Sequence, residues 1–210
     1  MVELRKRKAP PPPPVTEKKS RKSQAPAKQP EDRGSGQADS VDRALNVGDT
    51  VSLEGFGGEI EANDGTKTTL RKLVDESDSG VVLFTYPRAS TPGCTKQACL
   101  FRDHYDQLTS TGLSIYGLSS DSPKSNTTFQ TKQSLPYPLL CDTDASLIAE
   151  IGFKKQPKGT TRGVFAVDKA GKVLARQAGS PDATVQAVQQ LIDDKTGTTG
   201  DEEKAGSGEQ

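Results

Sequence analysis

The chain has 210 residues, 31% of them hydrophobic and 27% charged, which allows one medium-sized domain with polar tails. No apolar run approaches the ~20 residues that span a bilayer, and the N-terminus lacks the apolar segment of a secretory signal, so we expect a soluble intracellular protein without a membrane anchor. Three cysteines are odd in number and too few for a disulfide framework, so we expect free thiols, ligands or redox centres.

The net charge of zero conceals opposite charges at the two ends of the chain. Residues 1–30 carry nine Lys and Arg against two Glu, a net charge of +7, whereas residues 193–210 carry six Asp and Glu against two Lys, a net charge of −4. Residues 1–43 and 196–210 contain too little apolar surface to offset the entropy of ordering. We therefore predict two disordered tails around a folded domain at residues 44–195.

Two basic clusters lie in the N-terminal tail, separated by a proline-containing spacer. Their members are Arg5, Lys6, Arg7, Lys8, Lys18, Lys19, Arg21 and Lys22. This spacing is typical of a bipartite nuclear-import signal, bound by an import receptor, and it also suits contact with nucleic-acid phosphates. A basic tail that only improves solubility is the alternative. We expect a nuclear protein, with an additional cytoplasmic pool as a further option.

The folded region is expected to open with a hairpin. Residues 51–53 alternate between apolar and polar, residues 63–65 (Asn-Asp-Gly) are typical of a tight turn, and residues 66–70 resume a strand pattern. Helical spacing follows at residues 70–74. After a polar loop, the apolar run at residues 81–86 predicts a strand that is buried on both faces.

A helix that contains Cys94 is expected to run to about Thr109, followed by a second buried strand at residues 113–118. Strand, helix, strand predicts parallel strands joined by a right-handed crossover. The later elements are a helix at about 123–133, an extended segment into 139–141, a short helix at 145–151, a hairpin of strands 163–167 and 172–175, and a helix from 181 to about 195. This order predicts an α/β fold with a central mixed sheet flanked by helices, the layout of a thioredoxin-like fold.

Cys94 stands where a predicted strand gives way to a helix. A thiol at a helix N-terminus faces unpaired backbone N–H groups and the positive end of the helix dipole. Both favour the thiolate, which is the nucleophilic form of cysteine. The position therefore predicts nucleophilic chemistry at Cys94.

The spacing of Pro87, Thr91 and Cys94, Pro-x3-Thr-x2-Cys, resembles the motif of the peroxiredoxins. Thr91-Pro-Gly-Cys-Thr with a second cysteine at Cys99 resembles the bacterioferritin-comigratory-protein or peroxiredoxin Q branch. Arg162 precedes a predicted strand, where the family places its catalytic arginine. The resemblance covers roughly residues 45–192, and the basic tail resembles that of fungal nuclear thiol peroxidases.

The resemblance implies a monomeric thiol peroxidase that needs no cofactor, reduces hydrogen peroxide and organic hydroperoxides, and is reset by thioredoxin. When a thiolate attacks one oxygen of a peroxide, the other oxygen leaves with negative charge. Forming the thiolate more readily also weakens it as a nucleophile, so an efficient enzyme must stabilise the transition state as well. Arg162, the Thr91 hydroxyl and the backbone N–H of Cys94 or Thr95 are the candidate donors, and Pro87 is expected to shield the site from water.

Each of these residues has a structural alternative. Thr91 can serve only as a helix cap, Pro87 only as a strand end, and Arg162 only as a surface charge. For Cys99 the alternative is a small buried residue of the helix.

Cys99 is predicted to be the resolving thiol, because the branch places a second cysteine there. If Cys94 and Cys99 lie on one helix, their Cα atoms stand roughly 8 to 9 Å apart. A disulfide requires less than about 7 Å. We therefore expect Cys94 to be oxidised to a sulfenic acid, the helix to unwind locally, and a Cys94–Cys99 disulfide to form with release of water.

Three further residues carry weaker expectations. Cys141 is predicted to be a small buried residue rather than a third redox centre. A Cys/His metal site around His104 fits no usual zinc spacing, so no metal is predicted. Gln97 stands where members of the family often have Glu, which puts the strength of any contact with the arginine in doubt.

Two other functional classes remain as alternatives. A thioredoxin-like disulfide oxidoreductase would use the same fold but normally a Cys-x2-Cys motif, which the chain lacks. A non-catalytic nuclear interaction protein would use the basic tail, and Cys94 would be incidental.

Overall fold

The structure, a computed structural model, describes residues 45–198. Along the chain the elements are β1 (Glu59–Ala62), β2 (Lys67–Thr69), α1 (Leu70–Glu76), β3 (Gly80–Thr85), α2 (Pro92–Asp103), α3 (Tyr105–Thr109), β4 (Leu113–Ser119), α4 (Pro123–Gln133), β5 (Leu139–Cys141), α5 (Ser146–Glu150), β6 (Gly163–Asp168), β7 (Val173–Ala178) and α6 (Pro181–Thr198). The predictions for residues 1–43 and for 199–210 lie outside the described residues. Within the described range, no helix is both long and apolar enough to cross a membrane.

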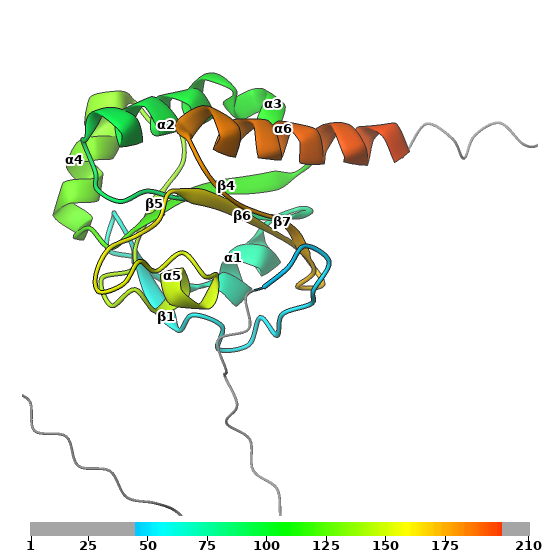
Figure 1. The fold of residues 1–210 in the computed structure, drawn as a ribbon, viewed down its shortest axis with the longest axis horizontal. Coiled ribbons are helices and arrows are strands. Elements are labelled where there is room, and N and C mark those ends of the chain that lie inside the picture. The colour runs from blue at the N-terminus through cyan, green and yellow to red at the C-terminus, as the bar shows by residue number, and fades with distance from the viewer. Residues whose placement is uncertain (1–44, 199–210) are drawn as a thin grey trace, which may run out of the picture. The chain divides into compact units, whose positions relative to one another are not determined.

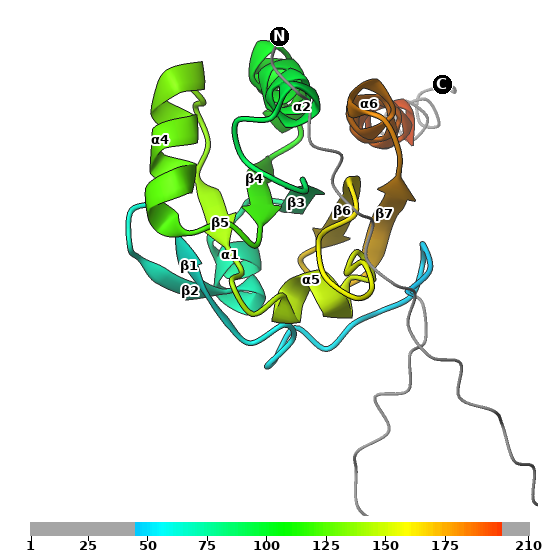
Figure 2. The ribbon, with the colours of Figure 1, turned by 60° about the vertical axis from the view of Figure 1, so that its left-hand side comes forward.

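The strands form one seven-stranded mixed sheet in the order β2-β1-β5-β4-β3-β6-β7 (Figure 1 and Figure 2). β3 pairs in parallel with β4, and β4 in parallel with β5, whereas β3 and β6 are antiparallel. The predicted parallel pairing of the strands on either side of α2 is therefore confirmed, as are the hairpin of β6 and β7 and the thioredoxin-like layout.

Helices cover both faces of the sheet. Figure 2 shows α2, α4 and α6 on one side of it and α1 and α5 on the other. β3 lies between two apolar clusters: Val82 and Phe84 belong to the cluster under α2 and α6, and Val81 and Leu83 belong to the cluster above α1 and α5. All four side chains are fully buried, each stabilising the fold by roughly 1.5 to 3 kcal/mol. The strand that leads to Cys94 is thus fixed from both faces.

Three predicted boundaries were wrong. The helix expected from Cys94 to about Thr109 is divided into α2 and α3, because the backbone of His104 (φ −105°, ψ 14°) leaves the helical region. Residues 51–53 are buried at Val51 and Leu53 as their alternation predicts, but they form no strand, and the first hairpin strand is β1. The last helix continues to Thr198 rather than to about 195.

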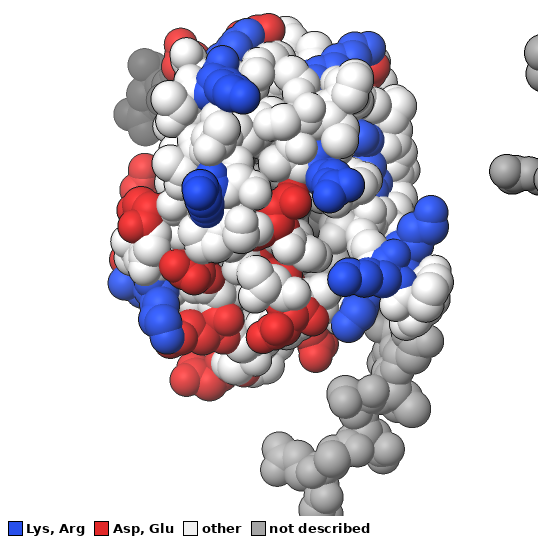
Figure 3. Space-filling view, turned by 90° about the vertical axis from the view of Figure 1, so that its left-hand side faces the viewer, with Lys and Arg blue, Asp and Glu red and all other residues white. Residues whose placement is uncertain are grey.

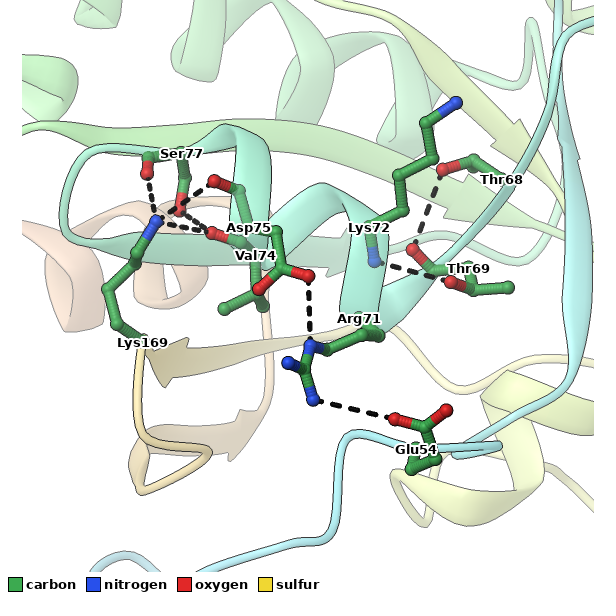
Figure 4. Close-up of polar contacts among 9 residues, drawn as sticks. All are labelled: Glu54, Thr68, Thr69, Arg71, Lys72, Val74, Asp75, Ser77 and Lys169. Atoms are coloured by element: carbon green, nitrogen blue, oxygen red, sulfur yellow. Dashed lines mark hydrogen bonds and ion pairs between the residues drawn. The ribbon is translucent and has the colours of Figure 1, made fainter.

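The C-terminal end of α1 is held by Lys169, which lies in the turn between β6 and β7 (Figure 4). The Lys169 ammonium donates hydrogen bonds to the carbonyl oxygens of Val74, Asp75 and Ser77, at 3.0, 3.0 and 2.5 Å. The last carbonyls of a helix have no partner within it, and a cation is favoured there. This contact attaches α1 to the β6–β7 hairpin, and Arg162 immediately precedes β6.

Candidate active site

Cys94 lies in the first turn of α2, just beyond the carboxyl end of β3. Pro92 occupies the first helical position, where its missing N–H is not needed. The N–H of Thr95 donates to the carbonyl oxygen of Thr91 at 2.8 Å, so the amides of Gly93 and Cys94 stand at the helix end without a helical acceptor. Cys94 as a residue is only 2% exposed. Cys94 therefore lies at the positive N-terminal end of a helix, as the sequence predicted.

The loop between β3 and α2 is held in place by Asp121, which follows β4. One carboxylate oxygen of Asp121 accepts a hydrogen bond from the N–H of Ala89 at 2.7 Å. Ser90 has a φ of +61°, a left-handed conformation that costs a residue other than glycine roughly 1 kcal/mol or more. The loop is thus fixed in a sharp turn that directs the chain into α2.

Arg162 reaches the helix end from the residue immediately before β6. One terminal nitrogen, Nη2, lies 3.4 Å from Cys94 Sγ, and the other, Nη1, donates to the carbonyl oxygen of Gly93 at 3.0 Å and to Gln97 Oε1 at 2.7 Å. A Cβ atom at Gly93 would lie 3.1 Å from Nη2, so the absence of a side chain at Gly93 permits this close approach. The guanidinium is therefore fixed beside the sulfur by three acceptors.

Gln97 connects Arg162 to helix α6. Its side-chain oxygen accepts from Arg162, and its nitrogen donates to the hydroxyl of Thr184 at 3.2 Å. Gln97 and Thr184 are both fully buried. The exposed ion pair of Lys96 and Asp182, at 2.7 Å, joins the same two helices. The Gln97 amide therefore keeps the contact with Arg162 and adds an N–H donor that a carboxylate lacks. No pattern in the sequence indicated that Thr184 would be its partner.

The structure places Thr91 and Pro87 less directly. The Thr91 hydroxyl donates to the carbonyl oxygen of Arg88 at 2.9 Å, and no hydrogen bond among the described residues joins it to Cys94. Its oxygen retains lone pairs that can accept from a bound peroxide. Pro87 is exposed and lines, with Arg88, a surface cavity of about 580 Å³ whose lining includes neither Cys94 nor Arg162. Its shielding role stays a prediction.

Cys99 lies on the same unbroken helix as Cys94, and both thiols are free. Five residues of α-helix place their Cα atoms roughly 8 to 9 Å apart, beyond the reach of a disulfide. The Cys99 thiol is half-buried and contacts the side-chain oxygen of Gln133 at 3.5 Å. The folded helix therefore keeps the two sulfurs apart.

Cys141 lies at the end of β5 and lines a surface hollow together with Glu59, Glu61, Asp142 and Asp144. Figure 3 shows that Asp and Glu side chains gather in groups on one face of the molecule. Burial raises the pKa of the Cys141 thiol, a hydrogen bond from Asn126 opposes the shift, and the negative charges of Glu61 and Asp121 add to it. This environment disfavours the thiolate, in agreement with the expectation of a small buried residue.

Among residues 45–198, no group of three or more His, Cys, Asp and Glu side chains is arranged to hold a metal ion.

The arrangement can perform nucleophilic chemistry at sulfur. The Cys94 thiol lies at a helix end, close to the two free amides of Gly93 and Cys94 and to the guanidinium of Arg162. Negative charge that develops beside the sulfur is therefore stabilised. The burial of Cys94 strengthens these interactions. A second thiol lies nearby but requires a conformational change before it can react.

Comparison with known proteins assigns the family. Residues 52–176 match the AhpC/TSA family. Peroxiredoxin bcp1 of Schizosaccharomyces pombe is 36% identical over 159 residues, which cover 74% of this chain and 78% of that protein. The crystal structure of peroxidoxin BcpB from Mycobacterium tuberculosis superimposes with a TM-score of 0.64 at 33% identity, covering 71% of this chain and 97% of that one.

A further solved relative comes from the same branch. The structure of the bacterioferritin comigratory protein of Xanthomonas campestris, studied for its alkyl peroxide reduction activity, has a TM-score of 0.61 at 27% identity and covers 70% of this chain and 99% of that one. The chain therefore belongs to the AhpC/TSA family, in its bacterioferritin-comigratory-protein or peroxiredoxin Q branch, and is a thiol peroxidase.

Proposed function

We propose that Cys94 is the nucleophile that reduces hydrogen peroxide and organic hydroperoxides, with Arg162 as the stabilising cation. The observation that carries this assignment is the 3.4 Å contact of Arg162 with the buried sulfur at the helix end. The Cys94 thiolate attacks one peroxide oxygen, the O–O bond breaks, and the other oxygen leaves as an alcohol or water after taking up a proton. Cys94 becomes a sulfenic acid.

The surrounding groups fit the transition state of this step. Negative charge develops on the departing oxygen, and Arg162 and the free amides of Gly93 and Cys94 are positioned to donate hydrogen bonds to it. The Thr91 oxygen can accept from the peroxide and orient it. Cys94 is buried, whereas Thr91 and Arg162 are partly exposed, so the substrate is expected to approach between these two side chains.

Cys99 then completes the cycle. Its sulfur attacks the sulfenic sulfur, an S–S bond forms, the S–O bond breaks, and the hydroxyl leaves as water. The span of the intact helix requires α2 to unwind first. A dithiol, by resemblance thioredoxin, reduces the Cys94–Cys99 disulfide. Every group in this scheme comes from one chain, so we expect a monomer to be active.

Replacing Cys99 by serine tests the cycle. The first turnover with peroxide is expected to keep its rate, since Cys94 and Arg162 are unchanged, whereas thioredoxin-coupled turnover falls by at least about tenfold because no disulfide forms. Rapid-quench mass spectrometry measures the first event, and thioredoxin oxidation the second. The matched control is Cys141→Ser, which is expected to preserve both. Undiminished coupled turnover in Cys99→Ser would contradict the resolving role.

We also propose that the basic clusters of the N-terminal tail direct the protein to the nucleus through an import receptor, on the strength of their bipartite spacing. A fluorescent fusion of the full chain is expected to accumulate in nuclei. Replacing Lys18, Lys19, Arg21 and Lys22 by alanine is expected to spread it through the cytoplasm without changing peroxidase activity. Nuclear accumulation of that variant would refute the assignment.

A further inference from the structure

Helix α2 is held at its midpoint by the side chain of Tyr137, a residue outside the peroxide site. The Tyr137 hydroxyl donates a hydrogen bond of 2.7 Å to the carbonyl oxygen of Ala98, and both residues are fully buried. Ala98 immediately precedes Cys99, and its carbonyl belongs to the peptide unit whose nitrogen is that of Cys99. Moving the Cys99 backbone out of the helix therefore moves this carbonyl.

Tyr137 is held by contacts on several sides. It stands between Pro136 and Pro138 just before β5, and its own carbonyl accepts from the Gln130 side chain at 2.9 Å. Its ring packs edge-on against Phe84, with centroids 5.5 Å apart, and lies 5.9 Å from Tyr105. Burial raises the pKa of Tyr137, so its hydroxyl remains a donor at physiological pH. These contacts oppose a movement of the tyrosine together with the helix when the helix unwinds.

Gln133, the last residue of α4, provides a second attachment on the same side of α2. Its side-chain oxygen is 3.5 Å from the Cys99 sulfur, and its carbonyl accepts from Arg102 at 2.7 Å. These contacts lie on the Cys99 half of the helix. The contacts of Arg162 with Gly93, Cys94 and Gln97 hold the other half.

We propose that Tyr137 and Gln133 form a clamp that sets the rate at which Cys99 reaches the oxidised Cys94, an inference that rests on the proposed two-cysteine cycle. When the Ala98 carbonyl moves away, the buried Tyr137 hydroxyl is left without an acceptor, which is costly. Since the clamp touches neither Cys94 nor Arg162, it acts on the resolution step and not on the reaction with peroxide.

The clamp also determines how long the sulfenic acid persists. A second peroxide can oxidise the waiting sulfenic acid to sulfinic acid, which thioredoxin does not reduce. Slow release of Cys99 favours this second oxidation. The clamp therefore sets the peroxide concentration at which the enzyme is inactivated.

Tyr137→Phe removes the hydroxyl and keeps the ring. Disulfide formation after one equivalent of peroxide is expected to accelerate about fivefold, the factor that corresponds to ~1 kcal/mol for one hydrogen bond. The rate constant for peroxide consumption should stay within about twofold, and sulfinic acid formed per turnover should fall by the same factor of about five. The chain has no tryptophan, so quenched-flow thiol tagging with mass spectrometry is the suitable measurement.

Tyr86→Phe is the matched control, because its buried hydroxyl bonds to Asn126 of α4 at 2.9 Å and not to α2. Its disulfide rate is expected to remain unchanged. Gln133→Ala is a second test and is expected to accelerate the same step. An unchanged or slower disulfide rate in Tyr137→Phe overturns the clamp. If the unmodified protein forms no Cys94–Cys99 disulfide at all, the proposed cycle itself fails, and the two failures are thereby distinguished.

Discussion

Cys94→Ser is expected to lower kcat/KM for hydrogen peroxide by at least about 10⁴-fold, as loss of an enzyme's nucleophile does. Serine preserves the size of the buried side chain, so α2 and the contacts of Arg162 should persist. Its hydroxyl forms no nucleophilic anion at neutral pH and cannot take up an oxygen atom from peroxide. Stopped-flow consumption of peroxide, coupled to thioredoxin, measures the loss.

Cys141→Ser is the control for this prediction, since Cys141 is also buried but its environment disfavours the thiolate. Its activity is expected to stay within about twofold of the unmodified protein, because serine can retain the contact with Asn126. Residual activity in Cys94→Ser that vanishes in Cys94→Ser/Cys141→Ser would show that the nucleophile had been assigned to the wrong cysteine.

Arg162→Gln is expected to reduce the rate constant for peroxide reduction by about 10²- to 10³-fold, the usual cost of a missing transition-state donor. The variant loses both the charge beside Cys94 and the bonds to Gly93 and Gln97. Arg162→Lys should recover only part of the rate, because an ammonium group cannot bond the sulfur and both oxygen acceptors with the planar geometry of a guanidinium. Rapid-quench measurement of the first turnover isolates this step.

The control arginine is Arg71 on the opposite face of the sheet, whose ion pairs with Glu54 and Asp75 appear in Figure 4. These pairs are exposed and screened by solvent, so Arg71→Gln is expected to leave both the stability and the peroxide rate nearly unchanged. Equal losses in Arg71→Gln and Arg162→Gln would reduce Arg162 to a structural residue.

Much of the fold was predictable because its signals are local. The apolar run of β3, the turn chemistry of the β6–β7 hairpin and Pro123 at the start of α4 each lie within a few residues of the element they define. The pairing of Cys94 with Arg162 is predictable from the sequence only through resemblance to a family. The helix N-terminus at Cys94 was predictable without the family resemblance, because the sequence patterns of the strand, the turn and the helix are all local.

The contacts that the sequence concealed join residues far apart in the chain. Gln97 and Thr184 are 87 positions apart, and Ala98 and Tyr137 are 39 apart, so neither pair leaves a periodic or local pattern. The break at His104 was missed for a related reason. Its amide still donates to Leu100, and its carbonyl still accepts from Leu108, so the helical hydrogen bonds continue although the dihedral angles of His104 leave the helical region.

The amide at position 97 also has a consequence for the behaviour of the site in acid. A glutamate there would be an ionisable partner of Arg162, and its protonation would weaken the attachment of the guanidinium. Gln97 does not titrate at physiological pH. The Gly93 carbonyl and the Thr184 hydroxyl, which complete the network, do not titrate there either. Apart from its contact with the Cys94 sulfur, the cation is therefore held by neutral groups, and acidification leaves those contacts with Gly93 and Gln97 unchanged.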